Sequence, residues 1–389
     1  MEYRLEELFD LQMGKTPSRS VTEYWESGNN KWISIADLSK CGKYIYDTKE
    51  CLSDIAVSES GIKQIPANTV VMSFKLSIGK TAITSEPMYS NEAIMSFRDR
   101  KLVQLLPEYI YYLLLSKNWD DGTNKAVMGK TLNKATLSKV KVNIHSMQEQ
   151  QEIVYVLNQA TALIELHQQQ LQKLDELVKA RFVELFGDPI VNSCKLPVVT
   201  LGEISGLITK GASPSWQGFS YINDKSQTLF VTSENVREGY LDLSSPKYVE
   251  DGFNVKQKRS VIHKGDFLIN IVGASIGRAA QFNLDCKANM NQASALVRIK
   301  DRRINEKYLL TYLNSDKAQR MYDSMKSDTG RANLSLQDIS NLSILLPPIK
   351  KQIEFDQFVN QVDKSKVAVQ KSLDEAQLLF DSLMQQYFE

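Results

Sequence analysis

Residues 146–159 read SMQEQQEIVYVLNQ, and residues 348–361 read PIKKQIEFDQFVNQ. After each opening, apolar residues recur at alternating intervals of four and three for about five heptads, which is the pattern of a coiled-coil seam. Ser146 and Glu149 have the spacing of a capping box, and Pro347-Pro348 is tolerated in a first helical turn. The sequence therefore predicts two helices, each spanning about 40 residues and roughly 60 Å at ~1.5 Å per residue.

The two predicted seams correspond position by position when 202 is added to each residue number of the first. Three of their positions carry polar or charged side chains, at His167, Arg181 and Lys366, and the others are apolar. The apolar seam residues that we assign to the spacer helices are Ile153, Leu157, Ile164, Leu171, Leu174, Val178, Phe355, Val359, Val362, Val369, Leu373 and Phe380.

The rest of the chain is duplicated as well, with an offset that drifts from 196 to 202. Matched pairs include LEEL 5–8 with LGEI 201–204, WIS 32–34 with FVT 230–232, SIGK 77–80 with SIGR 275–278, and NEA 91–93 with NQA 291–293. Ordered matches over nearly the full length indicate a duplicated domain. Each copy mixes short strands, at 69–74 and 265–270, with amphipathic helices, at 108–115 and 306–313. We predict an α+β fold for both copies.

The predicted order is domain, helix, domain, helix. The bounds are 1–145 for the first domain, 146–186 for the first helix, 187–197 for a linker, 198–347 for the second domain and 348–389 for the second helix. A pseudo-two-fold axis with antiparallel helices is the simplest assembly, and it returns the C-terminus, near Phe388, to the neighbourhood of Met1. A parallel pair of helices is the alternative.

Composition and charge limit the function. The net charge of +1 over 389 residues excludes a tail that coats nucleic acid indiscriminately. By segment the charge is +2 over 1–146, −3 over 147–197, +4 over 198–348 and −2 over 349–389. We expect no metal site, because the four cysteines are scattered. We also expect no membrane span and no signal peptide, and therefore a cytoplasmic protein.

Three Gly-Lys-Thr triplets, at 14–16, 79–81 and 129–131, resemble the end of a nucleotide-binding P-loop. A P-loop needs another glycine five residues earlier, where this chain has Phe9, Phe74 and Asn124. In the second copy, Arg278 is followed by alanine, so the hydroxyl for magnesium is also lost. The copies keep a glycine and a long cation, which suits a phosphate contact or a solvated turn at a strand end. Both interpretations stay open.

The chain combines duplicated domains and long helices with the segments PPIKKQIEF 347–355 and ARFVELFGDP 180–189. Together these features resemble the specificity (S) subunit of Type I restriction–modification enzymes. The resemblance covers essentially the whole chain, although His145-Ser146 stands where the second copy has Pro-Pro. It implies two target recognition domains that each read half of a split double-stranded DNA site. It also implies helices that set the gap and dock two methyltransferase subunits, with motor–nuclease subunits joining for cleavage.

The resemblance further implies a subunit without catalysis, whose S-adenosylmethionine is held by the methyltransferase partner. The sequence agrees, since it has no Asn/Asp-Pro-Pro-Tyr/Phe tetrad of adenine methylation and no glycine-rich cofactor loop. Two alternatives stay open. One is an NTPase built on the Gly-Lys-Thr triplets, which ATP binding would support. The other is a coiled-coil scaffold, which absence of DNA binding with methyltransferase subunits present would favour.

DNA affinity comes largely from phosphate contacts by Lys and Arg, and Asn or Gln amides can pair with adenine. For each Asn, a turn-forming role is the alternative to base readout. Residues repeated in both copies suit folding or phosphate contact, because half-sites usually differ. The candidate DNA-binding residues are Lys75, Ser77, Lys80, Asn91, Lys125, Lys130, Asn133, Lys134, Ser275, Arg278, Asn291, Gln292, Arg331 and Asn333.

Overall fold

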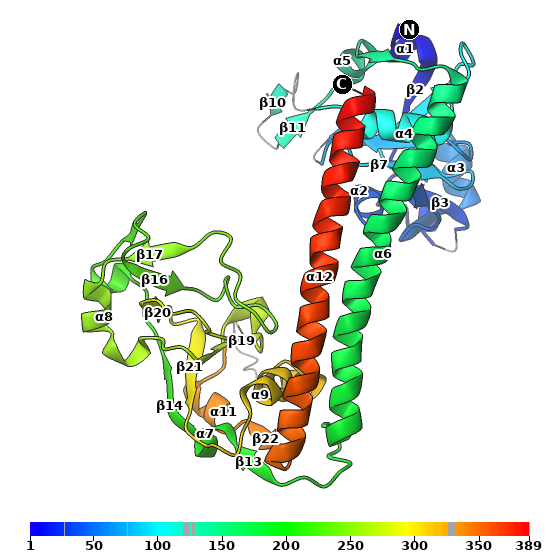
Figure 1. Cartoon of the computed structure of the whole chain (residues 1–389). Helices are drawn as coiled ribbons and strands as arrows, with labels where there is room; N and C mark the ends of the chain where they lie inside the picture. Colours follow the sequence, from blue (N-terminus) through cyan, green and yellow to red (C-terminus); the bar gives the residue numbers. More distant parts are fainter. Residues whose placement is uncertain (27, 76, 120–123, 127–128, 326–331, 389) are drawn as a thin grey trace. The chain divides into compact units, whose positions relative to one another are not determined.

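The structure of the chain is a computed structural model, and it describes residues 1–26, 28–75, 77–119, 124–126, 129–325 and 332–388 (Figure 1). Contacts divide the chain into two compact units. The first holds Met1–Gln169 and Gln370–Glu389, and the second holds Gln170–Val369. Each long helix is therefore shared between the units, and the predicted domain bounds stay a prediction. None of the described helices is long and apolar enough to cross a membrane.

The globular part of the first unit contains a five-stranded sheet in the order β2-β9-β6-β7-β4 and a three-stranded sheet in the order β5-β3-β8. Its strands are β1 Glu2–Arg4, β2 Phe9–Met13, β3 Asn30–Ile33, β4 Tyr44–Ile45, β5 Glu50–Leu52, β6 Val70–Ser73, β7 Thr81–Thr84, β8 Tyr89–Ser90, β9 Ile94–Asp99, β10 Asn124–Ala126, β11 Gly129–Thr131 and β12 Lys141–Asn143. Its helices are α1 Leu5–Leu8, α2 Ile35–Leu38, α3 Asp54–Ser60, α4 Pro107–Leu115 and α5 Lys134–Ser138.

The second unit contains two four-stranded sheets, in the orders β14-β21-β18-β19 and β15-β17-β16-β20. Its strands are β13 Val198–Thr200, β14 Ser205–Lys210, β15 Tyr221–Ile222, β16 Thr228–Val231, β17 Lys247–Val249, β18 Phe267–Asn270, β19 Ala279–Gln281, β20 Ala288–Met290, β21 Ser294–Ile299 and β22 Ser343–Leu345. Its helices are α7 Leu201–Ile204, α8 Gly252–Lys256, α9 Glu306–Leu313, α10 Asp316–Met325 and α11 Leu336–Ser340.

The central strands of the sheets repeat the sequence duplication. The central run β2-β9-β6-β7 matches β14-β21-β18-β19, and the parallel pair β3 with β8 matches the parallel pair β16 with β20. The matched β6 and β18 are fully buried, as their continuous apolar sequence predicts. The predicted α+β class with an internal repeat is confirmed.

The long helices are α6 Met147–Phe186 and α12 Ile349–Phe388, each of 40 residues. The capping box at the start of α6 is present. The Ser146 amide donates to Glu149 Oε2 at 2.8 Å, and the Glu149 amide donates to Ser146 Oγ at 3.3 Å. Every position of the two predicted seams is buried or half-buried. Two of the three polar seam residues make ion pairs between the helices in the second unit, Arg181 with Glu354 and Lys366 with Asp175.

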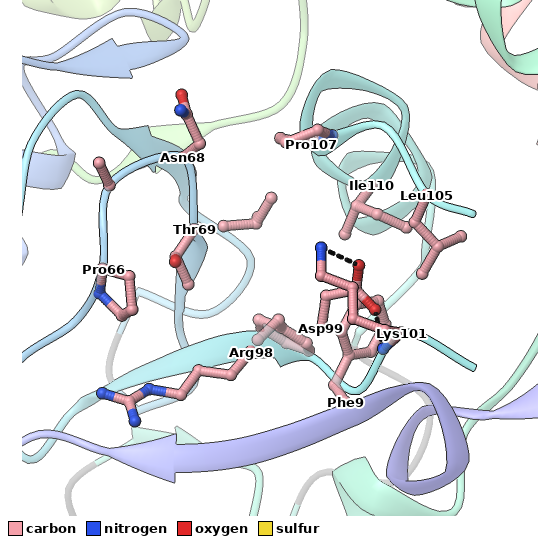
Figure 2. A pocket seen from close by; sticks show the side chains of 13 residues that line it. Phe9, Pro66, Asn68, Thr69, Arg98, Asp99, Lys101, Leu105, Pro107 and Ile110 are labelled. Atoms are coloured by element: carbon pink, nitrogen blue, oxygen red, sulfur yellow. Dashed lines mark hydrogen bonds and ion pairs between the residues drawn. The ribbon is translucent and has the colours of Figure 1, made fainter. Parts of the chain in front are cut away.

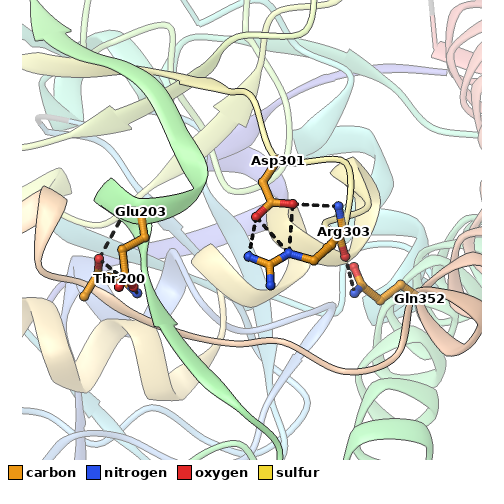
Figure 3. Close-up of polar contacts among 5 residues, drawn as sticks. All are labelled: Thr200, Glu203, Asp301, Arg303 and Gln352. Atoms are coloured by element: carbon orange, nitrogen blue, oxygen red, sulfur yellow. Dashed lines mark hydrogen bonds and ion pairs between the residues drawn. The ribbon is translucent and has the colours of Figure 1, made fainter.

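One buried glutamine anchors each long helix to its globular domain. Gln352 Nε2 donates to the carbonyl oxygens of Arg303 and Pro347, at 2.9 and 2.7 Å, and its Oε1 accepts from the Asn305 amide at 2.8 Å. Figure 3 shows Gln352 reaching Arg303, whose guanidinium pairs with Asp301. These bonds satisfy main-chain groups of the loop before α9, which would otherwise be costly to bury.

Gln150 makes the same bonds in the first unit. Its Nε2 donates to the carbonyl oxygens of Gln104 and His145, and its Oε1 accepts from the Leu106 amide. The two glutamines are 202 positions apart, as in the seams, whereas their partners in the loops before α4 and α9 are 199 apart. The duplication therefore extends to the junction between each domain and its helix.

The helices run antiparallel, as predicted. In the first unit, Phe380 and Leu383 of the last turns of α12 pack into the core that holds Ile153 and Leu157 of the first turns of α6. In the second unit, the last turns of α6 meet the first turns of α12, with the Phe186 ring centroid 5.6 Å from that of Phe355.

The antiparallel arrangement returns the end of α12 to the start of the chain. The Phe388 ring centroid lies 6.4 Å from the His145 ring, and the Met1 amino group donates to the neighbouring Ile144 carbonyl at 3.0 Å. Both described ends of the chain thus lie in the first unit (Figure 1).

Candidate nucleic-acid interface

The SIGK segment forms a tight turn between β6 and β7. The Ser73 amide donates to the Lys80 carbonyl and the Gly79 amide donates to the Ser73 carbonyl, both at 2.9 Å. The Lys80 amide donates to Ser73 Oγ at 3.1 Å, and Thr81 Oγ1 donates to the Gly79 carbonyl at 3.0 Å. The amides of Gly79 and Lys80, and the hydroxyl that a P-loop would offer to magnesium, are therefore engaged within the turn.

The SIGR segment repeats this turn between β18 and β19. The Asn270 amide donates to the Arg278 carbonyl and the Gly277 amide donates to the Asn270 carbonyl, again at 2.9 Å. Asn270 takes the place of Ser73, and its Nδ2 donates to Ser275 Oγ at 3.1 Å. We call residues 73–80 and 270–278 the glycine–cation turns.

The glycine of each turn is required by backbone conformation and by packing. Gly79 has φ +88° and Gly277 has φ +91°, in the left-handed region that favours glycine. A Cβ on Gly79 would lie 2.9 Å from the Trp119 ring, and one on Gly277 would lie 2.5 Å from the Tyr322 ring. The repeat in the sequence does not reveal these two aromatic supports, because they come from segments that differ between the copies: Trp119 follows α4, whereas Tyr322 lies on α10.

Two further segments of the first domain are hydrogen-bonded to the glycine–cation turn at Phe74, the first residue after β6. The Phe74 amide donates to the Ala93 carbonyl, and the Phe74 carbonyl accepts from the Leu132 amide, both at 3.0 Å. The structure thereby brings together three candidate groups that are far apart in sequence, around Lys80, around Asn91 and around Asn133.

The second domain repeats the convergence. The Ile271 amide donates to the Ala293 carbonyl, and the Ile271 carbonyl accepts from the Leu334 amide, both at 2.9 Å. Arg278, Asn291 and Asn333 are therefore gathered as well. Asn333 is not the equivalent of Asn133, because Ser335 takes that place as the cap of the following helix. We call each set of three segments a recognition edge: 73–80, 91–93 and 132–134 in the first domain, and 270–278, 291–293 and 332–334 in the second.

The asparagines of the recognition edges mostly have structural roles. Asn91 Oδ1 accepts from the Ala93 amide at 3.0 Å, and Asn291 Oδ1 accepts from the Ala293 amide at 3.1 Å. Asn133 caps α5 by accepting from the Thr136 amide at 2.7 Å. These three oxygens accept hydrogen bonds within turns or a helix cap, which supports the turn-forming interpretation, and base readout by these residues stays a prediction. Gln292 differs, since its buried Oε1 has no partner among the described residues.

The cations of the edges differ in their surroundings. Lys80 Nζ donates to Ser39 Oγ at 2.6 Å, and Lys75 Nζ lies 5.3 Å from the centre of the Phe74 ring. Lys134 is exposed on α5. The half-buried Arg278 guanidinium has no hydrogen-bond or ion-pair partner within the described part of the chain.

Several predicted residues cannot be assigned a contact. Lys125 and Lys130 face each other in the β10–β11 pair, but their side chains lie outside what the structure describes. Arg331 lies outside the described residues altogether. Ser77 is exposed, and its carbonyl accepts a hydrogen bond from Ser73 Oγ.

A further segment, around Lys15 and Thr16, lies behind the recognition edge of the first domain and was not predicted from the sequence. The Lys15 amide donates to the Ser90 carbonyl at 2.8 Å, and Thr16 Oγ1 donates to the Glu92 carboxylate. That hydrogen bond, assisted by the charge of Lys75, holds the pKa of Glu92 below its usual value despite partial burial. In the sequence, this segment was marked by the Gly-Lys-Thr triplet at 14–16. Its glycine lies against the main chain of Ser90 and Asn91.

An arginine at equivalent strand positions, half-buried in both domains, has different partners in each. In the second domain, Arg298 Nε and Nη2 donate to the two oxygens of Asp266, each at 2.7 Å. Arg98 is the equivalent arginine of the first domain. By strand register it lies opposite Thr69, whereas Arg298 lies opposite Asp266. Arg98 Nε is buried and has no hydrogen-bond partner among the described residues, and Arg98 lines a cavity of about 320 Å³ that Thr69 also lines (Figure 2).

The described residues contain no cluster of His, Cys, Asp or Glu able to hold a metal ion. The site therefore consists of two equivalent edges that offer cations, hydroxyls and amides. Such a set suits binding to phosphate and base edges.

Comparison with known proteins identifies the same duplication. The family model described as "Type I restriction modification DNA specificity domain" matches residues 1–176 and again 196–376. The "Type I restriction enzyme MjaIX specificity subunit" of Methanocaldococcus jannaschii is 24% identical over 402 residues, covering 98% of this chain and 90% of that protein. The "Type I restriction enzyme EcoBI specificity subunit" of Escherichia coli is 27% identical over 151 residues, covering 39% of this chain and 32% of that protein.

Solved structures share the fold. The S subunit of a Type I restriction–modification system from M. genitalium superposes with a TM-score of 0.53 at 15% identity, covering 100% of this chain and 96% of that one. A chain from a study of "complex assembly" and "conformational transition of the type I R-M system" superposes with a TM-score of 0.61 at 17% identity, covering 99% of this chain and 96% of that one.

Proposed function

Because the chain belongs to the family of Type I restriction modification DNA specificity domains, we propose that its two recognition edges are the surfaces that meet DNA. Each edge would face one half of a bipartite target. One observation carries the proposal: the same three segments converge in both domains through equivalent main-chain hydrogen bonds. A duplicated surface of this kind suits a DNA target that consists of two half-sites.

The chain acts as the DNA recognition subunit of a Type I restriction–modification complex, with methyltransferase and restriction subunits as partners. In this proposal it carries no catalytic group of its own, and S-adenosylmethionine is bound by the partner methyltransferase subunit. The helices α6 and α12 connect the domains, so they would set the gap between half-sites. Their acidic segments would repel phosphate and suit protein partners.

The methylation pattern in cells tests this function. With this chain and its methyltransferase subunit expressed together, mapped N6-methyladenine should fall in two short motifs separated by a gap of fixed length without sequence preference. A single continuous motif would contradict the bipartite target. Methylation that does not depend on the chain would contradict the recognition role itself.

The cations of the glycine–cation turns should contribute affinity without specificity. Replacing Lys80 or Arg278 with alanine removes one phosphate contact, so binding should weaken similarly for all sequences. The slope of log K against log salt should become shallower by about 0.9. Fluorescence anisotropy of labelled duplexes with the assembled methyltransferase complex, at several salt concentrations, measures both quantities.

The matched controls exchange the two cations, Lys80→Arg and Arg278→Lys. Each keeps the charge and should keep the salt slope. If an alanine variant instead changed the preferred bases at an unchanged slope, the side chain would read sequence and the assignment to phosphate would be wrong.

A further inference from the structure

The turns at 91–93 and 291–293 have the same backbone but differ in their central residue. In both, the Asn side chain accepts from the amide two residues later, and the following Ala carbonyl accepts from the glycine–cation turn. The central residue is Glu92 in the first domain and Gln292 in the second. A shared backbone that presents different side chains is what two different half-sites require.

Gln292 has an unused hydrogen-bonding group. Its Oε1 is buried and has no partner among the described residues. A buried acceptor without a donor is unfavourable, so rotation of the side chain toward a donor outside the protein would recover that free energy. The flanking Asn291 has its oxygen engaged in the turn, so Gln292 is the side-chain amide of this turn whose oxygen lacks a partner among the described residues.

Glu92 presents different chemistry at the same place. Thr16 Oγ1 donates to it and Lys75 contributes positive charge, and together they keep the pKa of Glu92 below its usual value. Glu92 is therefore ionised at neutral pH, and an ionised carboxylate only accepts hydrogen bonds. It is also exposed at the recognition edge.

These chemistries match different bases in the major groove. A glutamine amide can pair with adenine through two bonds, accepting from N6 and donating to N7, whereas a carboxylate accepts from the N4 amino group of cytosine. We propose that positions 92 and 292 are equivalent specificity-determining positions, at which Gln292 reads an adenine and Glu92 reads a cytosine. The inference rests on the proposed function, since it assumes that the recognition edges face DNA.

The test exchanges the two side chains, as Gln292→Glu and Glu92→Gln, in the complex with its methyltransferase subunit. Competition binding against duplexes that carry each base at every half-site position measures the discrimination. Gln292→Glu should lower the preference for adenine over other bases at one position by roughly 10- to 100-fold and favour cytosine there. Glu92→Gln should make the reverse change in the other half-site, and all remaining positions should keep their preference.

The added or removed charge will alter the affinity for all duplexes, so the decisive readout is the ratio of the affinities for two different DNA sequences. Gln292→Met keeps the approximate shape without hydrogen bonds, and it should abolish discrimination at that position while circular dichroism and melting temperature stay unchanged. If all variants changed affinity equally for every sequence, the inference would be wrong even though the chain still recognised DNA. If the unaltered complex bound no bipartite site, the proposed function itself would fail.

Discussion

Replacing Arg298 with alanine should destabilise the second domain by about 3–5 kcal/mol, because it leaves a buried carboxylate without its cation. The Asp266 side chain is only 2% exposed, and Arg298 supplies it with two charge-assisted hydrogen bonds. Within the described residues, the hydrogen bond to this carboxylate that would remain is the one from the His263 amide, at 2.7 Å. A single main-chain donor cannot replace the positive charge.

The duplication supplies the control for this prediction. Arg98 occupies the equivalent strand position but faces Thr69, and its Nη2 donates to the Gln64 carbonyl. Arg98→Ala leaves no buried charge behind, so it should cost less than about 1 kcal/mol. Native-state hydrogen exchange of the amides in β18 and β21, compared with those in β6 and β9, measures each domain separately. Equal losses from both variants would show that the ion pair does not account for the difference.

The repeat was visible in the sequence, and it favoured antiparallel helices as the simplest assembly while leaving a parallel pair open. The sequence was also sufficient to predict the two 40-residue helices and their seams. Those features depend on periodicity and caps, which are local. The 4-3 spacing fixes the seam, and Ser146 with Glu149 marks where α6 begins. The strands β6 and β18 were also predictable, because continuous apolar runs between turn signals are typical of buried strands.

The recognition edges could not be predicted as assemblies, since they depend on bonds between distant segments. The bond from the Leu132 amide to the Phe74 carbonyl brings together two of the Gly-Lys-Thr regions. No local pattern reports such a contact. The sequence also could not show which side-chain amides have hydrogen-bond partners, because the partners of Asn91 and Asn291 are set by the folded turns.

Gly211→Ala should disturb stability and DNA discrimination together, because this glycine lies directly behind the recognition edge of the second domain. A Cβ at this position would lie 1.8 Å from the Met290 carbonyl oxygen and 3.0 Å from that of Asn291. Both obstacles are backbone, so the turn that carries Gln292 must move. We expect a loss of about 3 kcal/mol or more in the stability of the second domain.

Gly206→Ala, within β14, is the matched control for this substitution. Its Cβ would meet Lys300 at 3.5 Å, an ordinary contact. This variant should therefore keep both stability and base preference. Thermal unfolding and competition binding of both variants separate the outcomes. If Gly211→Ala lowered stability but left discrimination unchanged in the molecules that remain folded, the turn at 291–293 would not hold the base-reading side chain.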